Sequence, residues 1–371
     1  MTQTNRQTIP LELGADSYNI EVAFGLREQL AEILAPYNQG QTFFVLSQHT
    51  ILEHYQSVLD TLESEGYKLV VHTVPADESA KNIRYAEEVW AAMVQAGCDR
   101  STVLLALGGG VVGDLGGFVA STYMRGIDCV QIPTTLLAMI DSAIGGKTAI
   151  NLDAGKNLVG RVYQPKAVIV DPGFLATLPE RNVVSSLAEG IKYGFIKEKR
   201  IFDLMDQRFD EMVALNNEEL LLDIIASSCR IKANIVSNDQ FEHGERRLLN
   251  YGHTIGHALE AIHAYQGLYH GEGVLYGMKC ANHISWQKGM LTDAEYQHAQ
   301  AALDKFPLPE LQNIDPDQVL EIVSHDKKNI NGQLHFVLLD GLGQAVTQTD
   351  VTPEQMIASL ATLKTGKRLA S

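Results

Sequence analysis

The sequence has few cysteines and lacks any long apolar run. Its four cysteines lie far apart among 371 residues and form no CxxC pair, so neither a disulfide framework nor a thiolate zinc site is indicated. No uninterrupted apolar stretch reaches the ~18 residues that a membrane helix needs, and residues 1–6 are polar with no apolar signal segment behind them. We therefore expect a protein of the reducing cytoplasm that does not enter a membrane.

Basic residues are scarce as well. The chain has 29 Lys and Arg against 45 Asp and Glu, a formal net charge of −16, and no long basic block. Such a surface repels nucleic acids and acidic membranes, which argues against both as general partners. An anionic ligand must therefore be held by a local cluster of basic side chains.

Short apolar runs alternate with helical stretches in the first half of the chain. This rhythm predicts a parallel or mixed sheet with crossover helices. The runs that we interpret as strands are residues 43–47, 68–74, 103–107, 129–133 and 167–171.

The second half of the chain has helical periodicity almost throughout, as in residues 220–236, 253–264 and 274–288. One exception is a predicted hairpin, residues 334–339 and 344–348, joined by a glycine turn. The length exceeds what one compact core usually serves. We therefore divide the chain into an α/β domain, residues 1–175, and a mainly α-helical domain, residues 176–371.

A glycine-rich turn joins the third predicted strand to the start of a helix. Its sequence is Gly108-Gly109-Gly110-Val111-Val112-Gly113-Asp114. Glycines allow the backbone to approach a phosphate closely, and free N–H groups at the positive helix end stabilise its charge. A standard dinucleotide fold has this turn after its first strand, and the alternative is a tight turn for helix packing. The context favours nucleotide binding.

Histidines and a carboxylate stand at helical spacings in the second half. His253 and His257 are four residues apart and would project from one face of a helix, and His270 follows within a His-Gly-Glu-Gly segment. Glu189 and Lys192 form a further pair three residues apart. Two histidines with a glutamate are a common open ligand set for catalytic zinc. Singly, each histidine is more often an ordinary polar residue, but glycines flank all three groups, which suggests close approach to the backbone.

Lysines recur beside glycines at Lys147 and Lys156, without the spacing of a Walker motif. Each one alone is most often a solvated surface group. As a set in an acidic protein, such residues can hold a substrate that carries both phosphate and carboxylate. The other members of the set are Arg125, Lys192, Lys232, Arg246 and Lys327.

Taken together, these motifs resemble the 3-dehydroquinate synthase family. The resemblance implies an N-terminal NAD-binding α/β domain, a C-terminal helical metal- and substrate-binding domain, and a homodimer. It places zinc or cobalt on Glu189, His253 and His270, although spacing alone would offer His257 as a ligand. The matching stretches are residues 108–114, 123–126, 132–137, 141–157, 188–194, 249–260, 270–273 and 326–329.

The same resemblance implies roles for further residues. His257 becomes a proton-transfer group, and Arg125 reaches the phosphate region of the partner's site. The implied NAD contacts are Glu78, Lys81, Gly110, Val111, Val112, Gly113, Asp114, Thr134, Thr135, Lys147, Lys156, Phe174, Leu175, Ala176 and Thr177. The implied substrate contacts are Asp141, Lys147, Lys156, Asn157, Lys192, Lys232, Arg246, Asn250 and either Lys327 or Lys328.

The implied activity belongs to the shikimate pathway of aromatic amino acid biosynthesis. It converts 3-deoxy-D-arabino-heptulosonate 7-phosphate, a phosphorylated sugar acid, into 3-dehydroquinate and phosphate, and NAD is reduced and reoxidised within each turnover. Three alternatives stay open: another sugar phosphate cyclase, a metal-dependent polyol dehydrogenase of similar build, and a non-catalytic NAD-binding or zinc-structural module. A neutral polyol would leave the basic cluster without a partner, whereas Arg125, Asn250 and His257 favour dehydroquinate formation over other cyclisations.

Overall fold

The computed structural model describes residues 6–263, 267–311, 314–324 and 334–363. The chain groups into two units, Met1–Pro179 with Glu218–Phe241 and Glu180–Asn217 with Glu242–Ser371. The helix α8 (Glu218–Asn238) thus belongs to the first unit although it follows helices of the second. The division at residues 175 and 176 stays a prediction about domains, and this helix is the main difference between it and the observed grouping.

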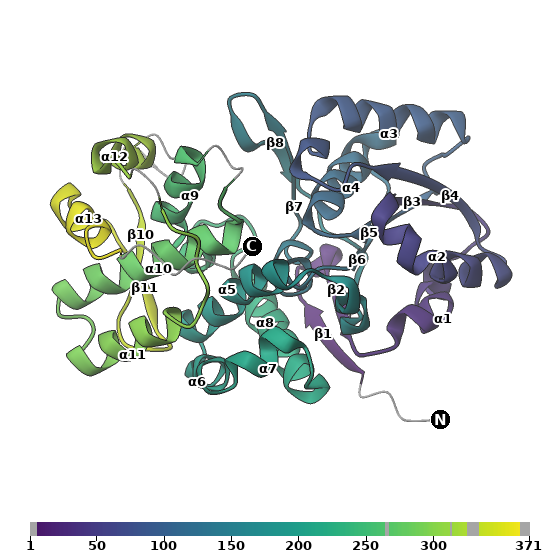
Figure 1. Ribbon diagram of the computed structural model, residues 1–371. Helices are drawn as coiled ribbons and strands as arrows, with labels where there is room; N and C mark the ends of the chain where they lie inside the picture. Colours follow the sequence, from purple (N-terminus) through teal and green to yellow (C-terminus); the bar gives the residue numbers. More distant parts are fainter. Residues whose placement is uncertain (1–5, 264–266, 312–313, 325–333, 364–371) are drawn as a thin grey trace. The chain divides into compact units, whose positions relative to one another are not determined.

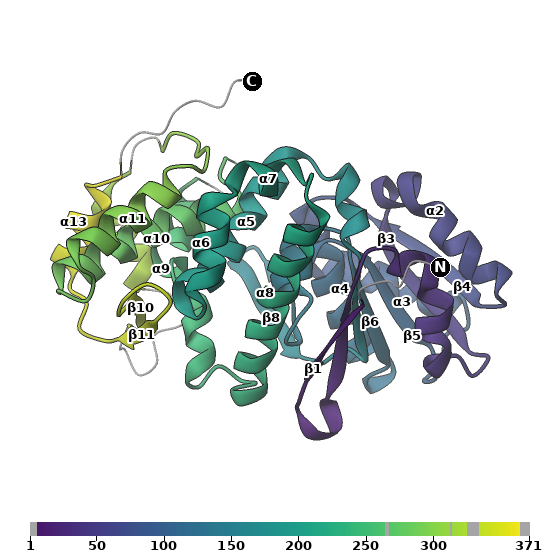
Figure 2. The ribbon, with the colours of Figure 1, turned by 90° about the horizontal axis from the view of Figure 1, so that it is seen from below.

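A seven-stranded sheet forms the centre of the first unit, and Figure 2 shows its strands side by side. Their order is β1-β2-β9-β6-β5-β3-β4, and every neighbouring pair is parallel except β1 with β2. The fold class expected from the sequence is confirmed. The strands are β1 (Gln7–Leu11), β2 (Tyr18–Val22), β3 (Thr42–Gln48), β4 (Lys68–Val74), β5 (Val103–Gly108), β6 (Asp128–Pro133) and β9 (Ala167–Val170).

Helices cover both faces of this sheet because the crossover from β3 to β4 runs in one direction along the sheet, whereas those from β4 to β5 and from β5 to β6 run in the other. Figure 1 shows α3 (Ile83–Gln95) and α4 (Gly110–Thr122) on one face, and α1 (Leu30–Leu34) and α2 (His49–Ser64) on the other. The strand β5 is buried along its whole length, as the unbroken apolar run of a strand covered on both faces requires. The first two strands, β1 and β2, were not predicted, so the glycine turn follows the fifth strand of the chain rather than the third.

A second hairpin, also unforeseen, consists of β7 (Lys147–Leu152) and β8 (Gly155–Val162). It follows one turn of π-helix, Ala138–Ser142, and packs on α4. A Cβ atom at Gly160 would lie 2.1 Å from the carbonyl oxygen of Thr148, so only glycine fits this hairpin position. The hairpin carries Lys147, Lys156 and Asn157, three of the residues expected to contact ligands.

The second unit is mainly helical, as predicted, and the hairpin of β10 (Phe336–Leu339) and β11 (Ala345–Gln348) is confirmed. Helix α10 packs against α5, α9, α11, α13 and β10 and is the core of the unit. No helix among the described residues is long and apolar enough to cross a membrane. The helices are α5 (Glu180–Ile196), α6 (Lys199–Gln207), α7 (Phe209–Ala214), α9 (His253–Ile262), α10 (His270–Gln287), α11 (Asp293–Leu303), α12 (Pro316–Ser324) and α13 (Pro353–Leu360).

Candidate active site

Three histidines and a glutamate meet in the second unit. His253 and His257 lie on α9, His270 is the first residue of α10, and Glu189 lies on α5. One ligand atom of each histidine lies within 4.8 Å of the others. The Oε1 atom of Glu189 is 3.5 Å from His253 Nε2 and 3.6 Å from His270 Nε2. The structure therefore brings all four predicted residues into one cluster.

Glycines make this cluster possible by letting α9 and α10 approach closely. A Cβ atom at Gly277 would lie 1.8 Å from the carbonyl oxygen of Gly252, and one at Gly256 would lie 2.7 Å from that of Gly273. Any other residue at these contacts would push the two helices apart. The glycines flanking the histidines in the sequence therefore serve helix packing, which brings His270 next to the α9 histidines.

Hydrogen-bond partners behind the cluster orient two of the imidazoles. The Nδ1 atom of His253 lies 3.1 Å from the carbonyl oxygen of Tyr251, and that of His270 lies 3.4 Å from Oε1 of Glu260. Both rings therefore present Nε2 to Glu189. Partners of this kind fix the tautomer and direction of metal-binding histidines. Glu260, which is buried, was missed as a functional residue, although it stands three residues after His257 in the same motif.

The charge of the cluster suits a cation. Glu189 is fully buried beside Lys192, which contacts its Oε2 atom and donates a hydrogen bond of 2.9 Å to the carbonyl oxygen of Leu249. Burial lowers the pKa of His270, but Glu260 and Glu189 outweigh it and raise that pKa to about 10. Two carboxylates thus favour a positive charge between imidazole nitrogens, which is what a divalent cation supplies. The donor set of oxygen and nitrogen fits zinc or cobalt.

His257 differs from the other two histidines in its access to solvent. Its side chain is 41% exposed, against 11% for His253 and 32% for His270. Its Nε2 atom lies 4.0 Å from Oε2 of Glu260, the carboxylate that also contacts His270. The geometry is compatible with two ligand sets, either the three histidines or Glu189 with two of them.

The predicted anion-binding residues of the second unit lie near this cluster in the sequence and are largely buried. Arg246 is 1% exposed, and Lys192 is equally buried on α5. Asn250 donates a hydrogen bond of 2.5 Å to Oε1 of Glu242. Lys327 and Lys328 lie outside the described residues, so their predicted contact stays a prediction.

The first unit carries the other predicted substrate residues. Lys232 on α8 donates to Oδ1 and to the carbonyl oxygen of Asp141, both at 2.6 Å. Lys147 and Asn157 on the β7–β8 hairpin are exposed, and Lys156 is partly exposed. Arg125 is exposed as well, on a turn that has positive φ angles at Met124, Arg125 and Gly126.

The glycine turn of the first unit has the features of a phosphate cradle. Helix α4 begins at Gly110, and a Cβ atom there would lie 3.1 Å from Oγ of Ser142. A Cβ atom at Gly109 would lie 2.9 Å from Cγ2 of Thr135. Among the described residues, the buried hydroxyls of Thr134 and Ser142 have no hydrogen-bond partner. Open backbone N–H groups and unsatisfied hydroxyls at a helix start fit the pyrophosphate of a dinucleotide.

A buried ion pair stands beside this turn. Lys81 donates 2.7 Å hydrogen bonds to Oδ2 of Asp114 and Oδ1 of Asn157, and its Nζ lies 3.4 Å from Oε1 of Glu78. Burial lowers the pKa of Lys81, but Asp114 and Glu78 outweigh it and raise that pKa. The structure therefore brings three of the predicted NAD contacts, Glu78, Lys81 and Asp114, together with Asn157, a predicted substrate contact.

The remaining predicted cofactor residues also follow sheet strands. Thr134 and Thr135 come directly after β6, and residues 174–177 come shortly after β9. The carboxyl ends of parallel strands share one edge of a sheet, where ligands of α/β folds bind. Phe174 and Leu175 are buried, so they can offer a ligand only their backbone, whereas Ala176 and Thr177 are exposed.

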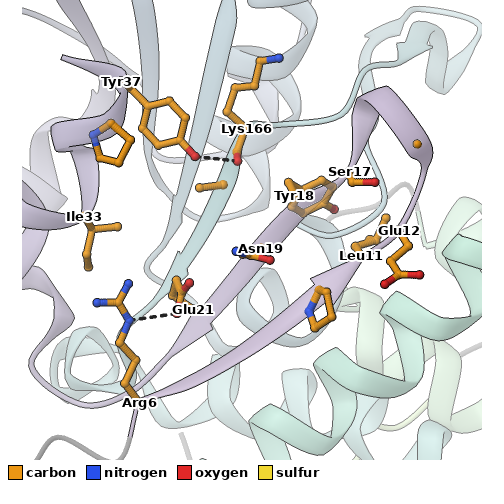
Figure 3. Close-up of a pocket in the computed structure, with 14 residues that line it drawn as sticks. Arg6, Leu11, Glu12, Ser17, Tyr18, Asn19, Glu21, Ile33, Tyr37 and Lys166 are labelled. Carbon is orange, nitrogen blue, oxygen red and sulfur yellow. Dashed lines mark hydrogen bonds and ion pairs between the residues drawn. The ribbon is translucent and has the colours of Figure 1, made fainter. Parts of the chain in front are cut away.

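Figure 3 shows a separate pocket of about 690 Å³ in the first unit, on the β1–β2 hairpin. Arg6 pairs with Glu21 across it at 3.0 Å, and the Tyr37 hydroxyl donates to the carbonyl oxygen of Lys166 at 3.0 Å. None of the predicted site residues lines this pocket. We therefore assign it no part in the chemistry.

A glycine cradle on a parallel sheet and a histidine–carboxylate cluster in a helical unit are the features of an enzyme that binds a nucleotide cofactor and a metal ion. The comparisons narrow this class. Two protein-family models match the chain: the family described as "3-dehydroquinate synthase N-terminal" matches residues 71–185, and the family described as "3-dehydroquinate synthase C-terminal" matches residues 186–329. The chain belongs to the 3-dehydroquinate synthase family.

Individual relatives agree with this assignment. The chain is 40% identical to a 3-dehydroquinate synthase of Rippkaea orientalis (strain PCC 8801 / RF-1), over 93% of this chain and 96% of the relative. ValA, a 2-epi-5-epi-valiolone synthase from Streptomyces hygroscopicus subsp. jinggangensis 5008 solved with NAD+ and Zn2+ bound, has a TM-score of 0.86 and 31% identity, covering 95% of this chain and 97% of its own.

A probable glycerol dehydrogenase from Sinorhizobium meliloti 1021 shares the fold with a TM-score of 0.64 and 16% identity, covering 91% of this chain and 94% of its own. At that identity the likeness concerns the fold alone. The relation to the synthases is far stronger, so a polyol dehydrogenase is not favoured.

Proposed function

We propose that this chain converts 3-deoxy-D-arabino-heptulosonate 7-phosphate into 3-dehydroquinate and phosphate. The observation that carries the proposal is the match to 3-dehydroquinate synthases along nearly the whole chain, at 40% identity. The histidine–carboxylate cluster and the glycine cradle supply the two sites that this reaction needs. The substrate is a phosphorylated sugar acid, and the enzyme is a carbon–oxygen lyase.

The proposal includes two cofactors. When bound, NAD accepts and returns a hydride, and zinc or cobalt polarises the reacting alcohol. We propose Glu189, His253 and His270 as the metal ligands. The glycine cradle at Gly110–Asp114 and the Lys81–Asp114 pair would hold NAD, with the two unsatisfied hydroxyls at Thr134 and Ser142 beside it.

The other residues bind and orient the substrate or move protons. We propose that Nε2 of His257 exchanges protons with the substrate, because this side chain is the most exposed of the three histidines. Lys192, Arg246 and Asn250 in the second unit, and Lys147, Lys156, Asn157 and Lys232 in the first, would hold the carboxylate and the phosphate. Asp141 fixes the ammonium of Lys232. Ring closure is intramolecular, so it depends mostly on positioning.

We also propose a cytoplasmic homodimer in which Arg125 serves the partner's phosphate site. In support, Arg125 is exposed on a turn with φ angles of 48° at Met124 and 73° at Arg125 itself. Such angles are unfavourable for these residues and are kept where surrounding structure or function requires them. Mixing Arg125→Ala with an inactive His253→Ala variant should restore part of the activity if sites are shared. Monomers of full activity would contradict this proposal.

The test of the function is phosphate release from the heptulosonate phosphate, with and without NAD and zinc. We expect release that requires both cofactors, a carbocyclic product and no accumulation of NADH absorbance. Stoichiometric NADH would indicate a dehydrogenase instead. Equal turnover of a sugar phosphate without the carboxylate would indicate another cyclase, because Arg246 and the lysines would then have no carboxylate to select.

A further inference from the structure

Helix α5 presents three residues at four-residue intervals: Arg181, Ser185 and Glu189. Residues at this spacing lie along one helix face. That face meets the start of α10, because the hydroxyl of Ser185 accepts a hydrogen bond of 3.1 Å from the N–H of Gly271. A Cβ atom at Gly271 would lie 1.8 Å from the carbonyl oxygen of Ser185. The two helices are therefore in tight backbone contact one residue beyond His270.

The guanidinium of Arg181 covers this contact on its solvent-exposed side. Arg181 donates from Nε to Oε1 of Glu272 at 2.7 Å and from Nη2 to Oε2 at 3.0 Å. The same Nη2 donates to the carbonyl oxygen of Gly267 at 3.0 Å. Its guanidinium carbon lies 4.1 Å from the centre of the Tyr269 ring. Arg181 thus holds residues on both sides of His270.

Glu272 is the buried half of this pair, with a side chain 2% exposed. Its Oε2 atom also accepts a hydrogen bond of 2.8 Å from the N–H of Tyr269, which caps the first turn of α10. A buried carboxylate that loses its cation strongly destabilises the structure around it. The pair therefore fixes where α10 begins and how its first turn faces α5.

We propose that Arg181 and Glu272 are positioning residues that set His270 against Glu189. This inference rests on the proposed ligand set. Arg181 shares α5 with Glu189, two turns away, and Glu272 shares the first turn of α10 with His270. Their fork of two hydrogen bonds fixes the spacing of the helices, and so the 3.6 Å between Glu189 Oε1 and His270 Nε2. Neither residue touches either ligand in any contact described.

The decisive measurement is the zinc dissociation constant of the folded full-length protein, by competition with a chromophoric chelator well below the unfolding temperature. Groups that hydrogen-bond directly to metal ligands typically change metal affinity by about 10- to 100-fold when they are removed. Arg181 acts on the ligands through the helices, so we expect a loss at the lower end of that range, about 10-fold, in Arg181→Ala. The cobalt-loaded variant should also show a shifted absorption spectrum, because the ligands are less well aligned. Arg181→Lys should recover only part of the loss, since a lysine cannot form the fork.

A control removes a forked pair elsewhere in the same unit that is matched in the exposure of its arginine, although its carboxylate, Glu211, is 39% exposed and Glu272 is 2% exposed. Arg208 forms a forked pair with Glu211, and its side chain is 38% exposed against 39% for Arg181. Arg208→Ala should leave zinc affinity and the cobalt spectrum unchanged. A loss of affinity in this control equal to that in Arg181→Ala would mean that general loosening, and not positioning, is measured.

The variant Glu272→Gln keeps the size and one oxygen, which can still accept from the N–H of Tyr269. It removes the charge and replaces the oxygen that accepts from Nε of Arg181 with an amide NH2 group, so it breaks the fork and covers the case in which Arg181→Ala does not fold. We expect weaker zinc binding in it too. Wild-type zinc affinity in either folded variant would overturn the inference. The ligand set is tested separately by Glu189→Gln. Unchanged zinc binding in Glu189→Gln would refute the proposed metal site itself. Loss of zinc binding in Glu189→Gln together with normal zinc binding in Arg181→Ala would refute only the positioning role.

Discussion

The close contact between α9 and α10 allows us to predict how strongly a substitution at Gly277 destabilises the protein. In Gly277→Ala, the new Cβ atom would lie 1.8 Å from the carbonyl oxygen of Gly252 and 2.9 Å from the backbone nitrogen of Gly256. Ordinary contact between such atoms is about 3.5 Å. Both obstacles are backbone atoms, which no rotamer change can move. The helices must therefore separate by about 1 Å or more at this point.

This separation should cost both stability and metal affinity. Overpacking of a well-packed core typically costs about 1–3 kcal/mol of unfolding free energy, and the full backbone contact places Gly277→Ala at the upper end of that range. His253 stands at the start of α9, directly after Gly252, whereas His270 lies on α10. Moving one helix relative to the other therefore separates proposed ligands, so zinc affinity should fall in the same variant.

The assay is urea unfolding of the metal-free protein beside zinc competition. Gly273→Ala is the graded control, because its Cβ atom would meet Cγ of Glu260 at 3.0 Å and the carbonyl oxygen of Gly256 at 3.1 Å. A shift of a few tenths of an ångström relieves these contacts, so its losses should be smaller. Equal stability of Gly277→Ala and wild type would refute the reasoning.

Three other predictions concern single side chains. His253→Ala should lose both zinc and turnover, whereas His257→Ala should keep zinc and lose about 10²- to 10⁴-fold in rate; elemental analysis beside phosphate release checks this, and a zinc-free His257→Ala would contradict it. Lys81→Met should weaken NAD binding in titration calorimetry and lower the unfolding free energy by roughly 1–3 kcal/mol, because it leaves the partly buried Asp114 carboxylate without its lysine partner. Unchanged NAD affinity would argue against this part of the cradle. In the metal-free protein, the pKa of His270 is raised from 6.5 to about 10, so the stabilising contribution of this residue is full below pH 6.5 and is lost as the pH rises towards 10. Urea unfolding across that range should show a decline of the unfolding free energy that is absent in His270→Ala. An identical decline in both proteins would refute this prediction.

The central strands of the sheet and the long helices could be predicted from the sequence because their patterns are local. The run at residues 103–107 is apolar at every position, and β5 is buried at every position. The β1–β2 hairpin has no such signal, since its first strand contains Pro10 and exposes alternate residues at the edge of the sheet. Periodicity also identified α8 as a helix, but it contains no information on which unit that helix packs against.

The sequence of the β7–β8 hairpin contains a strand pattern as well as the glycine–lysine motifs. Apolar Ile150 and Leu152 alternate with polar residues, and Asp153-Ala154-Gly155 is a plausible turn. The lysines beside the glycines indicated ligand binding, and the hairpin was therefore not predicted. The structure accommodates both interpretations, because the hairpin is what holds Lys147 and Lys156 in the first unit.

The metal cluster marks the limit of what spacing can decide. The interval between His253 and His257 places both on one face of α9, and this face is consistent with a chelate or with one ligand and one proton carrier. The two rings differ in their surroundings: Nδ1 of His253 lies 3.1 Å from the carbonyl oxygen of Tyr251, and Nε2 of His257 lies 4.0 Å from Glu260, a carboxylate that also contacts His270. Tyr251 directly precedes α9 and Glu260 lies on α9, but the contact of Glu260 with His270 on α10 joins two helices, and no spacing in the sequence reveals it. The side chain of His257 is 41% exposed against 11% for His253, and this difference in exposure supports the proposal that His253 binds the metal and His257 exchanges protons.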